Sequence, residues 1–181
     1  KLDIKNDIQE LKRMGVERII MLTGDNEMVA KRISDSLGLT EYHANLLPDQ
    51  KLDFIKNTLS KKYKTMMVGD GINDAAALSL SDIGVAMGGI GYDVTIESAD
   101  VVLMKDDFSK IPDIIGLSKY VMQISNQDFL IWGLTNVIGL IFVFIGAFKP
   151  TEASAYNFLT DFVPLMNSMR IFKLYIGRKA M

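Results

Sequence analysis

The sequence predicts an α/β domain followed by two helices that cross a membrane, and two patterns in its 181 residues support this. Up to about Lys119, short apolar runs alternate with segments of helical periodicity, which indicates a Rossmann-like parallel sheet. From Phe129 to Phe148 no residue is charged, and an apolar run of about 20 residues is long enough to span a bilayer. We therefore expect a soluble domain over residues 1–118 and a membrane region over residues 119–181.

The expected elements of the soluble domain follow from apolar periodicity and from the residues that interrupt it. Gly15 and Gly38 are suited to end helices, and Pro48 is suited to the first turn of one. In order, we expect a helix over 1–14, a strand over 16–22, a helix over 27–37, a helix from Pro48, a strand over 64–68 that leads into Gly69, a helix after Asp74, and strands over 83–87 and 100–104. His43, the single histidine, is interpreted as a surface residue in a loop.

Charge and cysteine content narrow the possible partners. The formal net charge is −2 and no basic stripe is present, so we do not expect a nucleic-acid partner. The absence of cysteine excludes disulfides and thiolate metal sites within this sequence.

The stretch Met66–Asp74, MMVGDGIND, carries the strongest signal of a site. It is typical of a buried strand that ends in a glycine-bent turn and leads into a helix. Asp70 and Asp74 would then lie at the carboxyl end of a strand, where open α/β sheets bind ligands. The pair suits Mg²⁺, which takes one or two protein carboxylates and completes its shell with phosphate and water. A lone Asp-Gly pair would indicate a solvated turn, but the full string GDGxND favours a metal site.

Two further residues are candidates for holding a phosphate group. Thr23 follows a strand and opens the string TGDN, in which a hydroxyl and backbone N–H groups could hold phosphate. The same string is equally consistent with a helix start capped by Asp25 or Asn26. Lys51 lies in the first turn of a helix, where the helix dipole disfavours a cation. By itself it would be a solvated lysine, but its position between the TGD and GDG segments favours a role facing phosphate.

These motifs resemble those of a known family. GDGIND is similar to the metal-binding motif of P-type ATPases, which belong to the haloacid dehalogenase superfamily, and SDIGVAMGGIGYDVTIESADVVLM resembles their heavy-metal-transporting (P1B) branch. The resemblance implies that residues 1–118 are the C-terminal half of the cytoplasmic phosphorylation domain, followed by a linker helix and the last two transmembrane helices. It also implies phosphate contacts for Thr23 and Lys51, a place near the nucleotide for Gly24 and Asp25, and Mg²⁺ binding by Asp70 and Asp74 with support from Asn73.

The resemblance further implies an ATP-driven exporter of a divalent transition or heavy-metal cation, which works through an aspartyl-phosphate. The acceptor string DKTGT of that family does not occur in these 181 residues. We therefore do not expect this chain alone to hydrolyse ATP, and we expect the N-terminal remainder of the pump as its partner. A soluble phosphatase of the superfamily would need a DxD strand before Thr23, and none is present. A non-catalytic membrane remnant or interaction protein is the other alternative.

Two membrane-spanning helices are expected at about 129–148 and 153–172, after an amphipathic helix over 109–127. Trp132 suits an interfacial anchor, and the segment from Lys149 to Glu152 is expected to form an exposed turn. Basic residues follow at the end of the second span, namely Arg170, Lys173, Arg178 and Lys179. By the positive-inside rule they place the C-terminus, and with it the soluble domain, in the cytoplasm.

Three polar residues in these spans are candidates for a cation path: Asn136, Asn157 and Asp161. An ionisable side chain costs about 2.5–3.5 kcal/mol at the centre of a span, so Asp161 is a functional candidate. For the asparagines, polar contact between packed helices is an equal alternative. The segment from Glu152 to Arg170 resembles the zinc, cadmium and lead exporters. Neutral Asn136 and Asn157 stand where those exporters carry a charged pair, which leaves the cation open.

Overall fold

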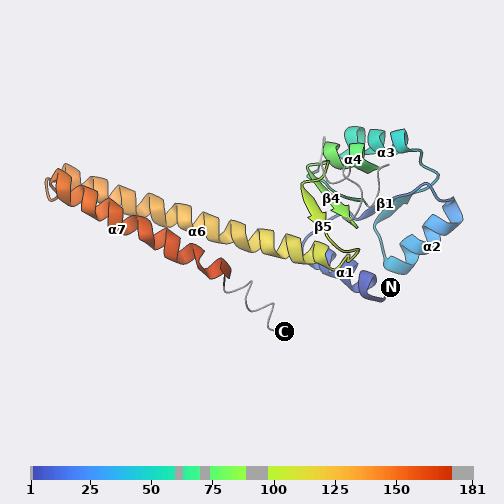
Figure 1. The fold of residues 1–181 in the computed structure, drawn as a ribbon, viewed down its shortest axis with the longest axis horizontal. Helices are drawn as coiled ribbons and strands as arrows, with labels where there is room; N and C mark the ends of the chain where they lie inside the picture. Colours follow the sequence, from blue (N-terminus) through green and yellow to red (C-terminus); the bar gives the residue numbers. More distant parts are fainter. Residues whose placement is uncertain (1, 60–62, 70–73, 89–97, 173–181) are drawn as a thin grey trace. The chain divides into compact units, whose positions relative to one another are not determined.

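The computed structural model describes residues 2–59, 63–69, 74–88 and 98–172, and the chain forms two compact units, residues 1–113 and 114–181 (Figure 1). The described strands all belong to the first unit. Helix α6 (Lys110–Phe144) lies almost entirely in the second unit, together with α7 (Pro150–Ser168). The α/β class expected for the first unit is confirmed, because its strands pair in parallel and alternate with helices.

The strands form two parallel sheets. The first contains β1 (Ile20–Leu22) and β2 (Glu41–His43), and the second contains β3 (Met66–Gly69), β4 (Ile83–Met87) and β5 (Val101–Leu103) in that order. The last three agree closely with the expected strands. The strand expected over 16–22 is wrong in length, since β1 has three residues, all of them half-buried. Sequence reasoning missed β2, because Glu-Tyr-His contains no apolar run.

The helices of the first unit begin and end close to the expected residues. They are α1 (Leu2–Arg13), α2 (Glu27–Leu37), α3 (Pro48–Phe54), the π-helix η1 (Ile55–Leu59) and α4 (Ala75–Leu80). The side-chain oxygen of Asn26 accepts a hydrogen bond from the N–H of Val29 at 3.0 Å, so Asn26, rather than Asp25, caps α2. Gly38 ends the helix at φ 70°, a left-handed conformation that favours glycine.

The part of the core that positions the candidate site lies where α4 packs on the second sheet. Leu78 of α4 and Val85 of β4 are both 0% exposed. The helix approaches the strand closely, because a Cβ atom at Gly84 would lie 2.8 Å from the carbonyl oxygen of Leu78. This packing brings the end of β3 beside the start of α4, and the candidate site lies at that junction.

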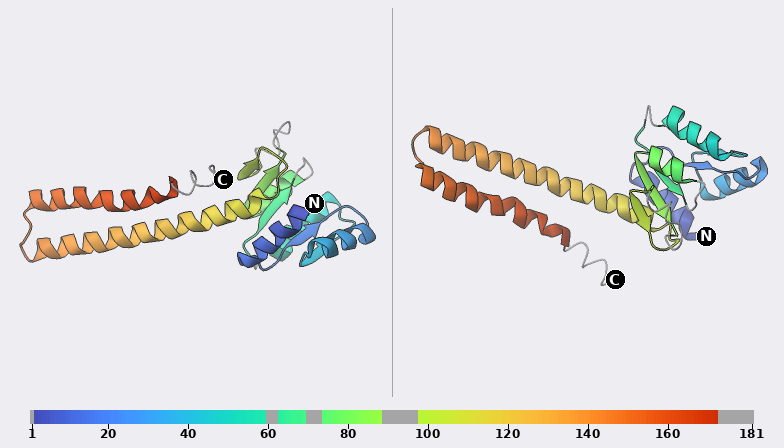
Figure 2. Two further views of the ribbon diagram at one scale, coloured as in Figure 1. Left: turned by 90° about the horizontal axis from the view of Figure 1, so that it is seen from below. Right: turned by 45° about the horizontal axis from the view of Figure 1, so that its top comes forward.

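In the second unit α7 runs back along α6 (Figure 2). Helix α6 is continuous over 35 residues, so the separate amphipathic helix and first span expected on either side of Asp128 form a single element. The expected span reaches Phe148, whereas α6 ends at Phe144 and Gly146 adopts φ 72° in the connection that follows. A glycine at positive φ ends the helix before the apolar run ends.

The exposed turn expected at residues 149–152 is wrong. Helix α7 begins at Pro150, where the fixed φ of proline and its missing N–H suit the first helical position. The Glu152 carboxylate accepts a hydrogen bond from the N–H of Lys149 at 2.8 Å and caps the new helix. Helix α7 therefore begins three residues before the expected 153 and is described to Ser168.

The two helices pack through a glycine. A Cβ atom at Gly139 would lie 2.8 Å from Cε1 of Tyr156, so the tyrosine ring rests on the backbone of α6. The Tyr156 hydroxyl donates a hydrogen bond to the carbonyl oxygen of Thr135 at 3.0 Å. Farther along the pair, the Asp128 carboxylate accepts a hydrogen bond from Nδ2 of Asn167 at 2.8 Å. These contacts fix the register of α7 on α6.

Large apolar side chains cover the outside of both helices. Phe129, Phe144 and Phe158 are 69%, 85% and 65% exposed. Among the described residues, α6 is the one helix that is long and apolar enough to cross a membrane. Helix α7 is shorter and includes Asn157 and Asp161.

Candidate functional site

Lys51 and Asp74 form an ion pair although 23 residues separate them in the sequence. Lys51 Nζ lies 3.0 Å from Asp74 Oδ1, and the two side chains are 18% and 13% exposed. Lys51 is the fourth residue of α3, and Asp74 directly precedes α4. A pair with so little contact with solvent is screened less than a surface pair. The sequence singled out both residues, and the structure brings them into contact.

The position of Asp74 depends on Gly69, the last residue of β3. Asp74 occupies the N-cap position of α4, but its side chain makes no capping hydrogen bond. The side chain instead lies against Gly69, where an added Cβ atom would be 3.0 Å from Asp74 Cβ and 3.2 Å from Asp74 Oδ2. Any larger residue at position 69 would displace the carboxylate. The glycine of the GDG string therefore makes room for the second acidic residue of the motif.

The chemistry of Asp74 suits one ligand position of a Mg²⁺ ion. Lys51 contacts Oδ1 of the carboxylate, which leaves Oδ2 as a hard oxygen donor. Asp70 and Asn73, the other residues expected to act here, lie outside the described residues. In the described part of the chain, no three His, Cys, Asp or Glu side chains gather into a metal site. A single carboxylate is compatible with Mg²⁺, which commonly keeps water and substrate phosphate as its remaining ligands.

The loop that carries Thr23 is fixed to the segment that leads into α3. The Thr23 hydroxyl donates to Oδ2 of Asp25 at 3.1 Å and accepts from the N–H of Asp25 at the same distance. The backbone N–H of Leu46 donates to the Thr23 carbonyl at 3.0 Å, and that of Asn45 donates to the Asp25 carbonyl at 2.8 Å. A Cβ atom at Gly24 would lie 3.4 Å from the Leu46 carbonyl oxygen. Hydrogen bonds thus join the TGD loop to residues 45–46, which precede α3.

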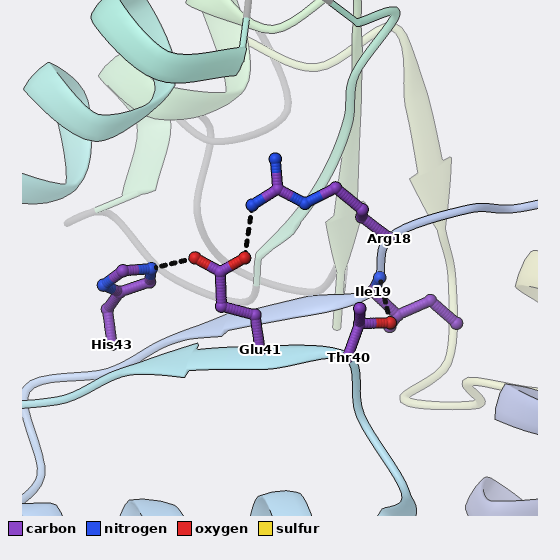
Figure 3. Close-up of polar contacts among 5 residues, drawn as sticks. All are labelled: Arg18, Ile19, Thr40, Glu41 and His43. Carbon is purple, nitrogen blue, oxygen red and sulfur yellow. Dashed lines mark hydrogen bonds and ion pairs between the residues drawn. The ribbon is translucent and has the colours of Figure 1, made fainter.

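His43 lies in β2 and not in the expected loop, and it belongs to a row of polar contacts (Figure 3). Glu41 stands between two partners: one carboxylate oxygen pairs with the Arg18 guanidinium, and the other lies 2.6 Å from Nε2 of His43. The Arg18 guanidinium first, and His43 second, lower the pKa of the Glu41 carboxyl below its usual value. Recognition of β2 would have found this row, because residues i and i+2 of a strand share a face.

The three candidates in the helix pair have different surroundings. Asn136 is half-buried, and its Nδ2 donates to the Trp132 carbonyl at 2.8 Å within α6. Asn157 is exposed beside the helix interface, with Oδ1 3.7 Å from the position that a Cβ atom would take at Gly139. Asp161 is exposed, one helical turn farther along α7. The structure does not join the three residues into a single site.

Sequence reasoning missed the polar contact at the start of the uncharged run. Asp128 accepts hydrogen bonds from Asn167 and from the Ser168 hydroxyl, and Arg170 donates to Oδ1 of Asn167 at 3.1 Å. The sequence analysis assigned no role to Asp128, which directly precedes the uncharged run that begins at Phe129. A carboxylate that packs between helices beside an apolar run needs hydrogen-bond donors. That requirement was the sequence signal that could have indicated this contact.

Comparison with known proteins decides the family. Residues 3–82 match the family model of haloacid dehalogenase-like hydrolases. The chain is 39% identical over 167 residues, 92% of its length, to a probable cadmium-transporting ATPase of Listeria monocytogenes. It is 40% identical over 175 residues, 96% of its length, to a zinc-transporting ATPase of Synechocystis sp.. A crystal structure of a zinc-transporting PIB-type ATPase matches 94% of the chain at 32% identity with a TM-score of 0.87.

The chain belongs to the heavy-metal-transporting P-type ATPases. A second solved structure, the catalytic domain of a CPx-ATPase, matches 61% of this P-type ATPase chain at 38% identity with a TM-score of 0.57. The chain spans about a quarter of the curated relatives it matches, 24% of both ATPases named above, and 28% of the zinc-transporting structure.

Proposed function

We propose that this P-type ATPase chain is the C-terminal part of an ATP-driven exporter of a divalent transition or heavy-metal cation. Its first unit would supply the phosphate and Mg²⁺ environment in which an aspartyl-phosphate forms and breaks down. The contact between Lys51 and Asp74 carries this proposal. It places a cation and a hard oxygen ligand together at the end of a parallel strand, where α/β folds bind ligands.

The roles proposed for the residues follow from their charges and positions. Lys51 would neutralise charge on the transferred phosphoryl group, as catalysis of phosphoryl transfer requires. Thr23 would contact the same group through its hydroxyl, and Gly24 and Asp25 would lie near the nucleotide. Asp74, with Asp70 and supported by Asn73, would hold Mg²⁺. When bound, the metal ion supplies charge neutralisation for the phosphate oxygens.

The acceptor aspartate would come from a part of the pump outside this sequence. β1 and β3 are each an outer strand of their sheet, so both have an edge at which a further parallel strand could pair. A strand that ends in the acceptor would reach the level of Gly69 and Thr23, which lie at the ends of β3 and β1. This supports a partner segment as the source of the nucleophile.

The second unit would provide the last two membrane-spanning helices. The outward apolar side chains of α6 and α7 support burial in lipid, and residues 1–118 with the C-terminus would lie in the cytoplasm. Asn136, Asn157 and Asp161 would contribute to the cation path. Because the relatives are named for transport of cadmium, zinc or manganese, a divalent transition or heavy-metal cation is the proposed cargo.

The test combines identification of the protein in its own membranes with phosphorylation. Membranes are incubated with radiolabelled ATP and Mg²⁺, and the polypeptide that carries this sequence is isolated and its intact mass is measured. We expect a label that survives acid and is released by hydroxylamine, as an acyl phosphate is, on this polypeptide or on one that co-purifies with it. A lone chain of 20.2 kDa without label would contradict the proposal and favour the interaction protein.

A matched pair of lysine variants ties the result to the site. Lys51→Ala should reduce the phosphorylation level strongly, because the phosphoryl group loses its partner cation. Lys64→Ala is the control, since Lys64 is 92% exposed and pairs with Asp82 at the surface. Equal loss in both variants would indicate a nonspecific effect and remove the support for Lys51.

A further inference from the structure

Helix α3, which carries Lys51, continues directly into η1, whose first residue, Ile55, is 2% exposed. None of the seven residues of α3 itself is buried, so the orientation of its side chains depends on contacts outside the core. Among the described residues, two polar or aromatic side-chain contacts tie α3 to other elements. One is the ion pair from Lys51 to Asp74, and the other is the contact of the Phe54 ring with the His43 ring, whose centroids are 4.4 Å apart.

The second contact continues into the row of Figure 3. His43 Nε2 lies 2.6 Å from Glu41, and Glu41 pairs with Arg18. The Arg18 guanidinium lies over the Tyr63 ring, 5.5 Å from its centroid. The row Tyr63–Arg18–Glu41–His43–Phe54 therefore joins the end of α3 and the residue at position 63 to the β1–β2 sheet. It holds the segment that begins with α3 at two points.

His43 also contacts the strand that ends in Thr23. Its backbone carbonyl accepts a hydrogen bond from the N–H of Thr23 at 3.0 Å. Its ring contacts Phe54, which lies three residues after Lys51 and thus about one helical turn away. One residue of β2 is therefore hydrogen-bonded to Thr23 and in ring contact with α3, the two places that carry the proposed phosphate contacts.

We propose that His43 is a positioning residue for Lys51 and Thr23. The row through Glu41 and Arg18 fixes the orientation of the His43 ring, the ring fixes the end of α3, and α3 sets the reach of Lys51. Preorganised side chains of this kind need support from packing and hydrogen bonds around them. The inference rests on the proposed function of Lys51 and Thr23 as phosphate contacts, but the placement of Lys51 can be measured without phosphate.

The opposite face of β2 provides a matched control. Tyr42 lies between Glu41 and His43 in the strand, and alternate residues of a strand point to opposite faces. The Tyr42 hydroxyl donates to Oε1 of Glu27 in α2 at 2.8 Å. Tyr42→Phe therefore removes one polar contact of the same strand without touching the row or α3.

The experiment uses the full chain in detergent micelles and two substitutions that separate the links. His43→Phe keeps an aromatic ring against Phe54 and loses the hydrogen bond to Glu41. His43→Gln keeps a donor for Glu41 and loses the ring. The first readout is the side-chain NMR resonance of the Lys51 ammonium group. We expect it to shift towards that of a free lysine in both variants, and to remain unchanged in Tyr42→Phe.

The second readout is binding of inorganic phosphate in the presence of Mg²⁺, followed through the amide resonance of Thr23. We expect His43→Phe to weaken phosphate binding about tenfold, which corresponds to the loss of one hydrogen bond. Tyr42→Phe should leave phosphate binding unchanged. Failure of the unsubstituted chain to bind phosphate would count against the proposed function, while the Lys51 resonance would still decide the positioning role. An unchanged Lys51 resonance in both folded His43 variants would overturn the inference.

Discussion

In the first unit Leu78 and Val85 are sealed between α4 and β4, whereas in the second unit Phe129, Phe144 and Phe158 face outward with 69%, 85% and 65% of their surface exposed. The polar contacts do not follow this division, since the Lys51–Asp74 pair of the first unit is also largely shielded from solvent. Arg18 and Glu41 pair at the half-exposed face of a sheet, while Asp128 is held between two helices. The first unit therefore buries apolar side chains between a helix and a sheet. In the second unit, hydrogen bonds contribute to the contact between the two helices. The exposed apolar side chains of the second unit are what its proposed position in a membrane would require.

The largest expected effect tests burial in the first unit. Leu78→Ala should reduce the free energy of unfolding of this unit by about 2–5 kcal/mol, because a fully buried side chain leaves a cavity. Leu80→Ala in the same helix is the control, since Leu80 is 44% exposed and should cost far less. Hydrogen exchange of the β4 amides measures both. Similar losses in the two variants would contradict the packing described for α4.

The next effect tests helix packing in the second unit. Gly139→Ala should weaken the contact of α7 with α6 by about 1–3 kcal/mol, because the new methyl group would overlap the Tyr156 ring. Gly133→Ala is the control, since a Cβ atom at Gly133 has nothing within 4 Å and alanine favours the helix. Energy transfer between labels on the two helices reports thermal unfolding in micelles. This measurement distinguishes the two variants. If both variants unfold alike, the close contact at Gly139 does not hold the pair.

A smaller effect distinguishes structural from functional acids in the helix pair. Asp128→Ala should cost about 1–2 kcal/mol of helix pairing, because Asn167 and Ser168 lose their acceptor. Asp161→Asn should leave pairing unchanged, since Asp161 is exposed, and should lower metal-stimulated ATPase activity of the assembled pump. Unchanged metal-stimulated activity in Asp161→Asn would remove Asp161 from the proposed cation path.

The smallest effect concerns acid. The lowered pKa of Glu41 means that its pairing with Arg18 and His43 stabilises the first unit above the ordinary carboxyl pKa of 4.5. That contribution is lost as the pH falls below 4.5 towards the folded pKa. Glu41→Gln should therefore flatten the pH dependence of the melting temperature below pH 4.5, by no more than a few degrees because the pair is partly solvated. If Glu41→Gln leaves the pH dependence of the melting temperature below pH 4.5 unchanged, Glu41 does not contribute to that dependence.

Sequence reasoning predicted the elements with strong local signals. The bounds of α2 follow from a polar cap and a glycine stop, and β3 and β4 follow from apolar runs. It missed β2, because a strand of three mixed residues is defined only by its pairing with β1. It placed the turn between α6 and α7 too late, because an apolar run indicates length in a membrane and not where a helix ends.

The candidate site was predictable as residues but not as contacts. Lys51 and Asp74 were found through their motifs, and their roles stay predictions. Their ion pair depends on the approach of α3 to α4, which local sequence does not encode. The space for the Asp74 carboxylate depends on the missing side chain of Gly69. The Glu41–His43 contact was not predicted because β2 was not recognised as a strand. Only in a strand do residues 41 and 43 lie on the same face.

The short connection between α6 and α7 has a consequence for the order in which the chain assembles. Only residues 145–149 separate the two helices. Gly146 at positive φ lies just after the end of α6, and Pro150 and Glu152 stabilise the start of α7. Closing so few residues costs little entropy and occurs in well under a microsecond. Once α6 has formed, we therefore expect α7 to pack against Gly139 quickly, independently of more distant parts of the chain.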